Sequence, residues 1–273
     1  MATSTHKAIR PVDVLKVEGA AAVRTNDVSA AEEPLEIRLD GQPFVVTMRT
    51  PGADDDLAAG FLLAENIVRH PGEIAEMRQC QLNDNIFYVT LAGDATQRAA
   101  DAMAGRRHVT ATSACGVCGR RSIEDLMRHA VEVQSTFSVT ERTVAGLPAA
   151  LRSAQSAFDQ TGGLHAAGLF DGDGTLLRIA EDVGRHNAVD KVIGAELRDG
   201  TLPLSERLLF VSGRTSFEIV QKAVMAGVAV VGAVSAPSSL AIDLARAANV
   251  TLLGFVRGAS FNVYAHPERI RIS

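Results

Sequence analysis

The chain has no tryptophan, and aromatic residues make up only 4% of its 273 residues, so aliphatic side chains must build most of the core. It has no long apolar run: its most hydrophobic stretch, "AVMAGVAVVGAVSA", is too short and too rich in glycine to span a bilayer. Its three cysteines are too few for a disulfide framework, and its N-terminus lacks the apolar segment of a secretory signal. These absences predict a cytoplasmic protein with no membrane partner.

The charge balance excludes another class of partner. The formal net charge is −5, which does not favour a nucleic-acid-binding surface. Hydrophobic residues are 47% of the chain, an ordinary globular composition. The length suits one large domain or two closely packed ones with a sizeable core.

The first half of the chain shows the alternation typical of β-hairpins. Residues 1–30 carry little of it, and we interpret them as a partly flexible lead-in with one short strand near 12–17. "PLEIRLDGQPFVVTMRTPG" and "EIAEMRQCQLNDNIFYVTLAG" each predict a hairpin. Between them "ADDDLAAGFLLAENIVRH" predicts a helix with acids in its first turn, and a short helix is expected near 96–104. Residues 31–135 are predicted to form an N-terminal α+β domain.

The last third has the pattern of a parallel sheet. "RLLFV", "VAVVGAV" and "VTLLGFV" are continuous apolar runs, as strands buried on both faces require. Two helices separate them, the first with a capping-box pattern at Thr215 and Glu218 and the second with Pro237 in its first turn. Upstream, "SIEDLMRHAVEV" and "TVAGLPAALRSAQSAF" predict helices, and a hairpin turns at 171–174. The series predicts a layered α/β domain over 136–273.

"SACGVCGR" contains two cysteines spaced as Cys-x-x-Cys, and this spacing leaves several chemistries open. A structural zinc site needs four ligands, but only Cys80 remains, inside a strand pattern, and no histidine lies at a recognisable ligand spacing. A thioredoxin-type couple needs its first cysteine at a strand-to-helix junction, whereas Gly116 and Gly119 loosen this loop. A reversible disulfide and two ordinary loop thiols also stay open.

The residues after the pair favour ionised sulfur. Arg120 and Arg121 follow directly, and the start of the next helix adds partial positive charge, so a thiolate is stabilised over a thiol. A thiolate on a glycine-flanked loop can accept a group at one site and deliver it at another. Sulfane sulfur, carried as a persulfide, is a group that fits this chemistry.

Polar residues gather in "EDVGRHNAVDKVIGAEL". If this segment is helical throughout, Asp182, His186 and Asp190 lie on one face. That face is either a site wall, a metal pair or an ordinary exposed, salt-bridged surface. His165 follows Gly162 and Gly163 and is equally open, because such a turn either admits a ligand or is merely tight.

Two serine-rich loops, at 212–216 and 235–239, follow parallel strands and precede helices, and a third loop at 254–260 follows the last strand. Loops at the carboxyl ends of parallel strands line the ligand crevice of such sheets, and helix starts favour anions. With Arg214 and Arg257 they predict a ligand that bears phosphate, such as a nucleotide. The chain has no G-x-x-x-x-G-K-[ST], which excludes a P-loop NTPase, and no early G-x-G-x-x-G, which argues against a dinucleotide dehydrogenase.

Several of these strings together resemble one family, the formate dehydrogenase accessory sulfurtransferases of the FdhD/NarQ type. The matching segments run from about residue 33 to the end and include "PLEIRLDG", "SACGVCGR", "TGGLHAA", "EDVGRHNAVDK", "SGRTSFEIVQKA", "SAPSSLAIDLA" and "TLLGFVRG". The resemblance implies a sulfurtransferase that takes persulfide sulfur from a cysteine desulfurase. It would pass the sulfur to the molybdenum bis-molybdopterin guanine dinucleotide cofactor that formate dehydrogenase requires. The resemblance also implies a homodimer.

The resemblance places the chemistry on particular residues. Cys115 would carry the persulfide, and Cys118 would assist it. The cofactor would contact the end of the last strand, at Phe255, Val256, Arg257, Gly258, Ala259 and Ser260. The argument from the two serine-rich loops adds Ser212, Gly213, Arg214, Thr215 and Ser235, and His165 is included as a candidate wall of the site. No metal site of the protein's own is expected.

The fold implied by the resemblance is α/β: a C-terminal three-layer α/β/α domain of cytidine-deaminase-like type, a smaller N-terminal α+β domain, and a flexible Cys-x-x-Cys loop at about 106–121. Zinc deaminases need H-x-E and a downstream P-C-x-x-C. Here "HAA" lacks the glutamate and the Cys-x-x-Cys lies upstream, so deamination is not supported. Two alternatives to sulfur transfer stay open: a thiol–disulfide oxidoreductase, and a cofactor-binding chaperone with no covalent step.

Overall fold

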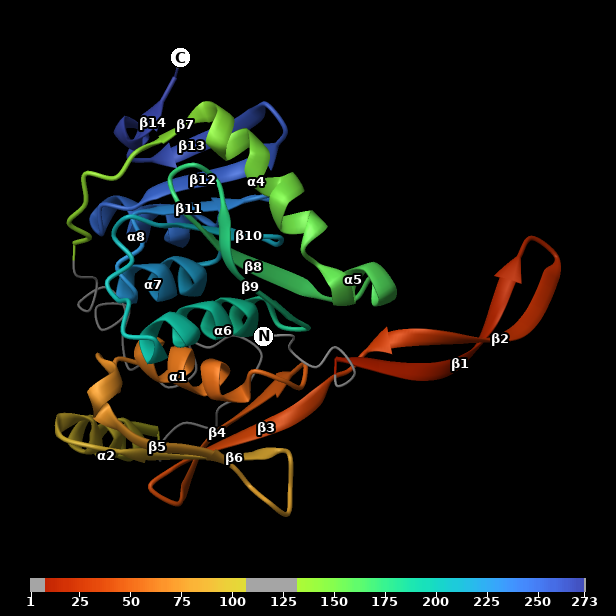
Figure 1. The fold of residues 1–273 in the computed structure, drawn as a ribbon, viewed down its shortest axis with the longest axis horizontal. Coiled ribbons are helices and arrows are strands. Elements are labelled where there is room, and N and C mark those ends of the chain that lie inside the picture. Colours follow the sequence, from red (N-terminus) through yellow and green to blue (C-terminus); the bar gives the residue numbers. More distant parts are fainter. Residues whose placement is uncertain (1–7, 107–131, 273) are drawn as a thin grey trace.

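The structure is a computed structural model that describes residues 8–106 and 132–272. Its elements are stacked in layers, with two β-sheets at different levels, helices between them, and a two-stranded arm that projects to one side (Figure 1). The chain is thus mixed α/β, as the sequence predicts. Cys115, Cys118 and the helix expected from Ser122 lie outside the described residues. The domain boundaries given above stay predictions.

A six-stranded sheet, in the order β13-β12-β11-β10-β8-β9, holds most of the strands predicted in the last third. β10, β11 and β12 run parallel, and β8 lies antiparallel to β10. β10 and β11 are buried along their whole length, which explains their continuous apolar sequence. The strands are β8 (His165–Phe170), β9 (Leu176–Asp182), β10 (Leu208–Val211), β11 (Val230–Ala233), β12 (Thr251–Arg257) and β13 (Ser260–Ala265).

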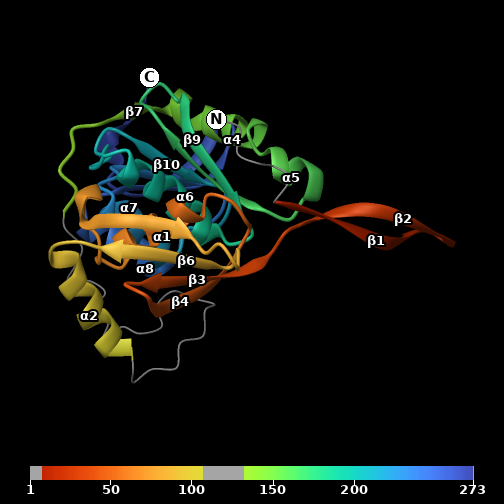
Figure 2. The same cartoon turned by 60° about the horizontal axis from the view of Figure 1, so that its bottom comes forward.

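Helices cover both faces of this sheet (Figures 1 and 2). α6 (Arg185–Arg198), α7 (Phe217–Met225) and α8 (Ser239–Ala247) lie on one face, and α4 (Glu141–Ser153) lies on the other. The helices expected after β10 and β11 are therefore confirmed. Within the described ranges, no helix combines the length and the apolar character that a membrane crossing needs.

The single helix expected from "TVAGLPAALRSAQSAF" is wrong, because two helices share this segment. α4 ends at Ser153, and the short α5 (Ser156–Thr161) follows. The Glu181 carboxylate explains the break: its oxygens accept the N–H groups of Ala157 and Phe158 at 2.9 and 2.7 Å. These bonds satisfy the free donors of a new helix start, so a second helix begins here.

A four-stranded sheet in the order β4-β3-β6-β5 forms the layer on the far side of α1 (Asp54–Ala64). Both predicted hairpins are confirmed, since β3 pairs with β4 and β5 with β6, both antiparallel. α1 begins with three acids, as predicted. The remaining elements are β3 (Glu33–Leu39), β4 (Gln42–Arg49), β5 (Ile74–Gln79), β6 (Ile86–Leu91), α2 (Asp94–Arg106), β7 (Val139–Thr140), β14 (Ile270–Arg271), η2 (Pro71–Glu73) and η3 (Pro267–Arg269).

α1 and α6 cross so closely that each needs a glycine at the contact. A Cβ on Gly60 of α1 would lie 2.0 Å from the Asp190 carbonyl oxygen, and a Cβ on Gly194 of α6 would lie 1.9 Å from the Asp56 carbonyl oxygen. No side chain fits at such distances. The two glycines therefore let the N-terminal layers pack directly on the helices of the six-stranded sheet.

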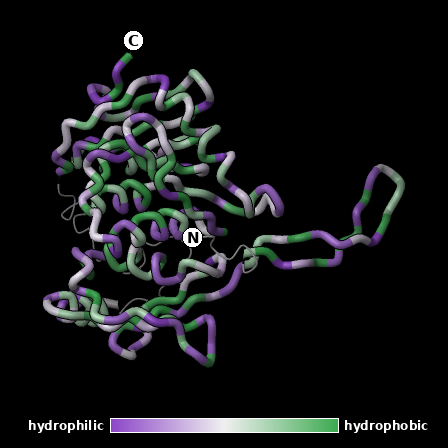
Figure 3. The backbone as a smooth tube through the Cα atoms, in the orientation of Figure 1, coloured by the Kyte–Doolittle hydropathy of each residue, from purple (hydrophilic) through white to green (hydrophobic). Residues whose placement is uncertain are grey.

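The arm corrects our interpretation of residues 1–30 as a lead-in with one short strand. β1 (Ile9–Glu18) and β2 (Ala21–Ala30) form an antiparallel ribbon that is paired over ten residues and projects from the body (Figure 1). Apolar and polar residues are mixed along it (Figure 3), and Leu15, Val17 and Val23 are 59, 62 and 63% exposed. Backbone pairing forms the ribbon without a core to bury, so the hydrophobic pattern that reveals most strands is weak here.

Candidate functional site

Several strands end at one edge of the six-stranded sheet. β10, β11 and β12 are parallel, so their carboxyl ends share this edge. β8 is antiparallel to β10, with Ala167 opposite Val211, so its first residue, His165, lies at the same edge. β9 also ends here, because Asp182 pairs with His165. The topology therefore brings His165 and Asp182 next to the loop that starts at Ser212.

Hydrogen bonds tie the first serine-rich loop to its neighbours. The Ser212 Oγ accepts the Ala166 N–H at 2.8 Å, which fixes the loop to β8. Thr215 donates its N–H to the Ala236 carbonyl at 3.2 Å, and its own carbonyl accepts the Ser238 N–H at 2.9 Å. The two serine-rich loops thus form one continuous surface.

The third loop is held beside the second. Phe255 donates its backbone N–H to the Ser235 carbonyl at 3.1 Å, and its φ of 52° is unusual for a large side chain. The Phe255 ring is exposed, and the Arg257 guanidinium lies 5.7 Å from the ring centroid. Arg257 pairs with Ser260 across the turn into β13, while Val256, between Phe255 and Arg257, is buried. Most of 255–260 is therefore an exposed hairpin tip next to the serine-rich loops.

Asp182 is a fully buried carboxylate with four partners. Its Oδ2 accepts the Thr50 N–H at 3.1 Å and lies 2.7 Å from the Lys191 Nζ. Its Oδ1 accepts the Gly184 N–H at 2.8 Å and the Asn187 side-chain amide at 2.9 Å. These bonds replace the water that a buried charge loses, and they fix the turn between β9 and α6.

Thr50, at the end of β4, joins this turn to the N-terminal layers through both its backbone and its side chain. Its carbonyl accepts from Lys191 Nζ at 2.8 Å, beside the N–H that binds Asp182. Its hydroxyl donates to the Ala31 carbonyl at 3.0 Å and accepts the Val183 N–H at 3.1 Å. The sheet edge and the base of the arm are thus connected through one residue.

The predicted row of Asp182, His186 and Asp190 along one helix face is wrong. Asp182 is the last residue of β9, and α6 begins only at Arg185. The reason is local: Asp182 takes the Gly184 N–H into its own side-chain bond, so a turn forms before the helix. His186 and Asp190 do share a face of α6, and both contact residues of α7.

His186 contacts the beginning of α7. Its Nε2 lies 2.9 Å from the Ser216 Oγ and 2.8 Å from the Glu218 Oε2. Because both partners share one ring nitrogen, this is not a Ser–His–acid triad. The capping box predicted from Thr215 and Glu218 is wrong as well: Ser216 is the N-cap residue, and Glu218 turns to His186 instead of back to the helix start.

Asp190 and Lys222 form an ion pair between α6 and α7. The two side chains are only 3 and 10% exposed, so this face is not the exposed salt-bridged surface that the sequence left open. Burial raises the pKa of Asp190 to about 6, while Lys222 acts in the opposite direction. The edge of the sheet therefore rests on two buried ion pairs, one through Lys191 and one through Lys222.

His165 and Arg185 lie on either side of Gly213. A Cβ on Gly213 would be 3.4 Å from the His165 Nδ1 and 3.6 Å from the Arg185 Cδ. Burial, and then the neighbouring Arg185 and His186, lower the pKa of His165, which favours its neutral ring. The Arg185 Nε is buried and has no hydrogen-bond partner among the described residues, and the same holds for the Thr215 Oγ1.

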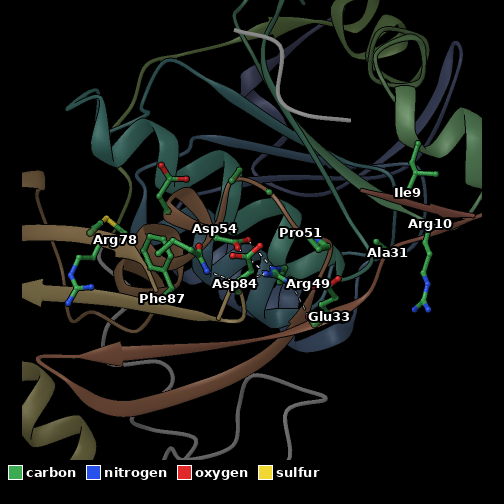
Figure 4. A pocket seen from close by; sticks show the side chains of 15 residues that line it. Ile9, Arg10, Ala31, Glu33, Arg49, Pro51, Asp54, Arg78, Asp84 and Phe87 are labelled. Carbon is green, nitrogen blue, oxygen red and sulfur yellow. Dashed lines mark hydrogen bonds and ion pairs between the residues drawn. The ribbon is translucent and has the colours of Figure 1, made fainter. Parts of the chain in front are cut away.

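A second candidate site is a cavity of about 600 Å³ at the base of the arm (Figure 4). Side chains of both charges line it, including Arg10, Arg78 and Glu33. Arg49 is buried and bound: its Nε and Nη2 each lie 3.0 Å from a carboxylate oxygen of Asp54. The Arg49 guanidinium is therefore already neutralised by carboxylates of the same lining.

The third cysteine lies away from its predicted place inside a strand. Cys80 follows the end of β5, and its backbone N–H donates to the Ile86 carbonyl at 2.9 Å across the hairpin. Hydrogen bonding by the Leu82 and Asn83 backbone lowers the pKa of its thiol. Cys80 therefore ionises more readily than an ordinary cysteine.

Sequence reasoning missed the residues that hold the sheet edge together. Lys191 and Lys222 are buried, and Thr50 and Asn187 bind the same cluster. One signal was available: each lysine stands among apolar residues in a helical segment, as in "VDKVIG" and "IVQKAVM", which indicates a buried cation with a partner.

The chain is a member of the FdhD/NarQ family, because the sequence model of that family matches residues 30–271. The curated relatives carry the name sulfur carrier protein FdhD. The protein from Nocardia farcinica is 48% identical over 267 residues, which cover 94% of this chain and 93% of the relative. The protein from Streptomyces avermitilis is 47% identical over 275 residues, covering 95% and 94%. The family predicted from the sequence is confirmed.

A crystal structure shares the fold. It comes from Desulfotalea psychrophila and is described as that of a candidate formate dehydrogenase accessory protein. Its TM-score is 0.77 at 22% identity, and the match covers 97% of this chain and 100% of that one. At this identity the likeness concerns the fold alone.

Proposed function

We propose that this chain is a sulfur carrier that takes persulfide sulfur from a cysteine desulfurase and delivers it to the molybdenum bis-molybdopterin guanine dinucleotide cofactor of formate dehydrogenase. The observation that carries the proposal is the identity of 48% to a relative named sulfur carrier protein FdhD, which extends over 94% of the chain. The Cys-x-x-Cys motif supplies the chemistry that such a name requires.

Loading of the sulfur is a thiol exchange at Cys115. Its thiolate attacks the outer sulfur of the donor's persulfide, so a new S–S bond forms on Cys115 and the donor leaves as a thiolate. Arg120 and Arg121 favour the attacking thiolate, and Cys118 assists the exchange. The chain then holds a persulfide whose terminal sulfur is passed to the cofactor.

The cofactor end of the reaction belongs to the sheet edge in this proposal. The tip 255–260 offers an exposed aromatic ring at Phe255, and the serine-rich loops lie beside it. A guanine base can stack on such a ring, and loops that precede helices suit its phosphates. The strand order β9-β8-β10-β11-β12 supports a cytidine-deaminase-like domain. A homodimer in the cytoplasm is part of the same proposal.

Intact mass spectrometry tests the loading step. After incubation with a cysteine desulfurase and cysteine, the chain should gain about 32 Da, one sulfur atom, which a reducing thiol removes. Cys80→Ser should gain the same mass and Cys115→Ser should not. This matched pair shows which of the two cysteines carries the sulfur. A chain that only loses about 2 Da to form a disulfide would instead be a thiol–disulfide oxidoreductase.

Maturation of formate dehydrogenase tests the other alternative. Cys115→Ser should abolish maturation, because the sulfur then has no carrier. If this variant still matures the dehydrogenase while the chain binds guanine nucleotides, the protein is a chaperone without a covalent step.

A further inference from the structure

We propose that Arg185, on the first turn of α6, binds the phosphate groups of the nucleotide ligand, in a recess that it forms with His165 and the loop Gly213–Thr215. The identity of the nucleotide rests on the proposed function, whereas the recess is argued from contacts alone. The sequence analysis assigned phosphate to Arg214 and Arg257, which are both exposed, and left Arg185 without a role.

Arg185 has a buried hydrogen-bond donor that is unsatisfied among the described residues. The Arg185 Nε is buried, yet it has no hydrogen-bond partner in the described part of the chain. A buried guanidinium N–H without an acceptor loses its hydration and gains nothing in return. Such groups are rare in folded proteins, and a ligand oxygen is one acceptor that explains this one. Thr215, in the adjacent loop, is also fully buried with its Oγ1 unpartnered.

Gly213 leaves space beside Arg185. Gly213 lies between the His165 ring and the Arg185 stem, since a Cβ there would be in van der Waals contact with both, at 3.4 and 3.6 Å. The missing side chain leaves partly exposed backbone between the Arg185 stem and the His165 imidazole. Bare backbone beside a cation is the arrangement that lets a phosphate approach closely.

The carboxylates near Arg185 have other partners. The nearby carboxylates are already bound, because Asp182 lies 2.7 Å from the Lys191 Nζ and Glu218 lies 2.8 Å from the His186 Nε2. Within the described residues, no carboxylate forms an ion pair with Arg185. Among the described residues, the Arg185 guanidinium therefore has no paired anion, and His165 adds a hydrogen-bonding ring beside it.

The chemistry of Arg185 favours phosphate among anions. A guanidinium offers parallel N–H groups that match two oxygens of one phosphate, and its Nε–H is one of them. A lysine at this position would keep the charge but lose the fork. Arg185 should thus contribute both charge and geometry, and the two contributions can be separated by substitution.

The test is calorimetric titration of the full chain with GDP, with inorganic pyrophosphate and with guanosine. Arg185→Gln should weaken GDP and pyrophosphate by about 10- to 100-fold, as expected for the loss of a charged hydrogen-bonding group. Arg185→Lys should lie between this variant and the wild type. Guanosine binding should not change. Arg142→Gln, on the exposed side of α4, is the matched control and should bind all three like the wild type.

A purely structural role of Arg185 would show in a different measurement. Because its Nε has no partner among residues 8–106 and 132–272, Arg185→Gln should keep the thermal midpoint of the wild type. A lowered midpoint with unchanged GDP affinity would overturn the proposal, and so would a wild type that binds neither GDP nor pyrophosphate.

The outcomes separate this proposal from the proposed function. Persulfide loading occurs on Cys115, so Arg185→Gln should still gain about 32 Da from a desulfurase. Loss of loading in the wild type, with pyrophosphate binding that depends on Arg185, would overturn sulfur transfer and leave the recess standing. If the wild type loads sulfur normally but binds phosphate equally well without Arg185, the role of Arg185 is overturned and sulfur transfer stands.

Discussion

Lys222 on α7 places its Nζ 2.7 and 2.8 Å from the two carboxylate oxygens of Asp190 on α6. The pair lies between two helices that begin near the carboxyl ends of β9 and β10, and both side chains are almost fully enclosed. Burial raises the pKa of Asp190 to about 6 despite the lysine. The folded protein therefore holds this proton more tightly than the unfolded chain does.

The raised pKa predicts how stability depends on pH. The contribution of Asp190 is fully present below its ordinary pKa of 3.8 and is lost as the pH rises through about 6. The loss amounts to about 3 kcal/mol. In Asp190→Asn this group no longer titrates, so the free energy of unfolding of the wild type, relative to the variant, should fall between about pH 4 and about pH 7. Urea unfolding at several pH values measures this difference, and parallel profiles would contradict it.

The glycine contact between α1 and α6 predicts severe effects from one methyl group. Gly60→Ala and Gly194→Ala force a Cβ to within 2.0 and 1.9 Å of a carbonyl oxygen on the other helix, so the helices must separate. Each variant should lose about 3 kcal/mol or more in denaturant unfolding. Gly146→Ala, in α4 with nothing within 4 Å of its Cβ, is the matched control and should gain up to about 1 kcal/mol from helix propensity. Similar losses at all three sites would disprove the close contact.

The partners of Asp182 predict that its charge is needed for the fold. In Asp182→Asn, an amide N–H₂ faces either the donors of Thr50 and Lys191 or those of Gly184 and Asn187, and Lys191 remains buried without its anion. We expect a loss of about 3 to 5 kcal/mol in urea unfolding. Asp159→Asn removes an exposed ion pair with Arg152 and should cost less than about 1 kcal/mol. Equal effects of the two variants would mean that the enclosed pair adds nothing.

A side chain at Gly254 should displace the hairpin tip 255–260. A Cβ on Gly254 would lie 2.9 Å from both the Pro237 Cδ and the Tyr264 Cε2, so Gly254→Ala should push Phe255 away from Ser235. If the tip binds guanine nucleotide, the affinity for GDP in calorimetry should fall by about tenfold, the scale of a modest packing strain. Unchanged affinity would remove the tip from the binding surface.

The β-α-β-α-β series was predictable because its strands are buried on both faces, which forces a continuous apolar sequence such as that of 208–211. The ribbon 9–30 was not, because its pairing buries no core and leaves Leu15 and Val23 in solvent. Only residues whose environment is apolar on one side carry a periodic signal.

The loops at the edge of the six-stranded sheet were predictable, whereas the buried residues that hold this edge together were not. Ser212 and Ser235 follow strand ends, and strand ends can be read from the sequence. Asp182 and Thr50 are 132 residues apart, and no local pattern connects them. The turn at Asp182 combines a local bond from Gly184 with distant partners such as Thr50, and only the distant ones leave no trace in the local sequence.

Thr50 has one further consequence. Ala31 directly follows the ribbon, and the Thr50 hydroxyl binds the Ala31 carbonyl, while the Thr50 backbone binds Asp182 and Lys191. A displacement of the ribbon would thus reach the start of α6 through a short series of hydrogen bonds, without involving the hydrophobic core. A partner bound to the ribbon would therefore be connected through Thr50 to the turn that precedes α6.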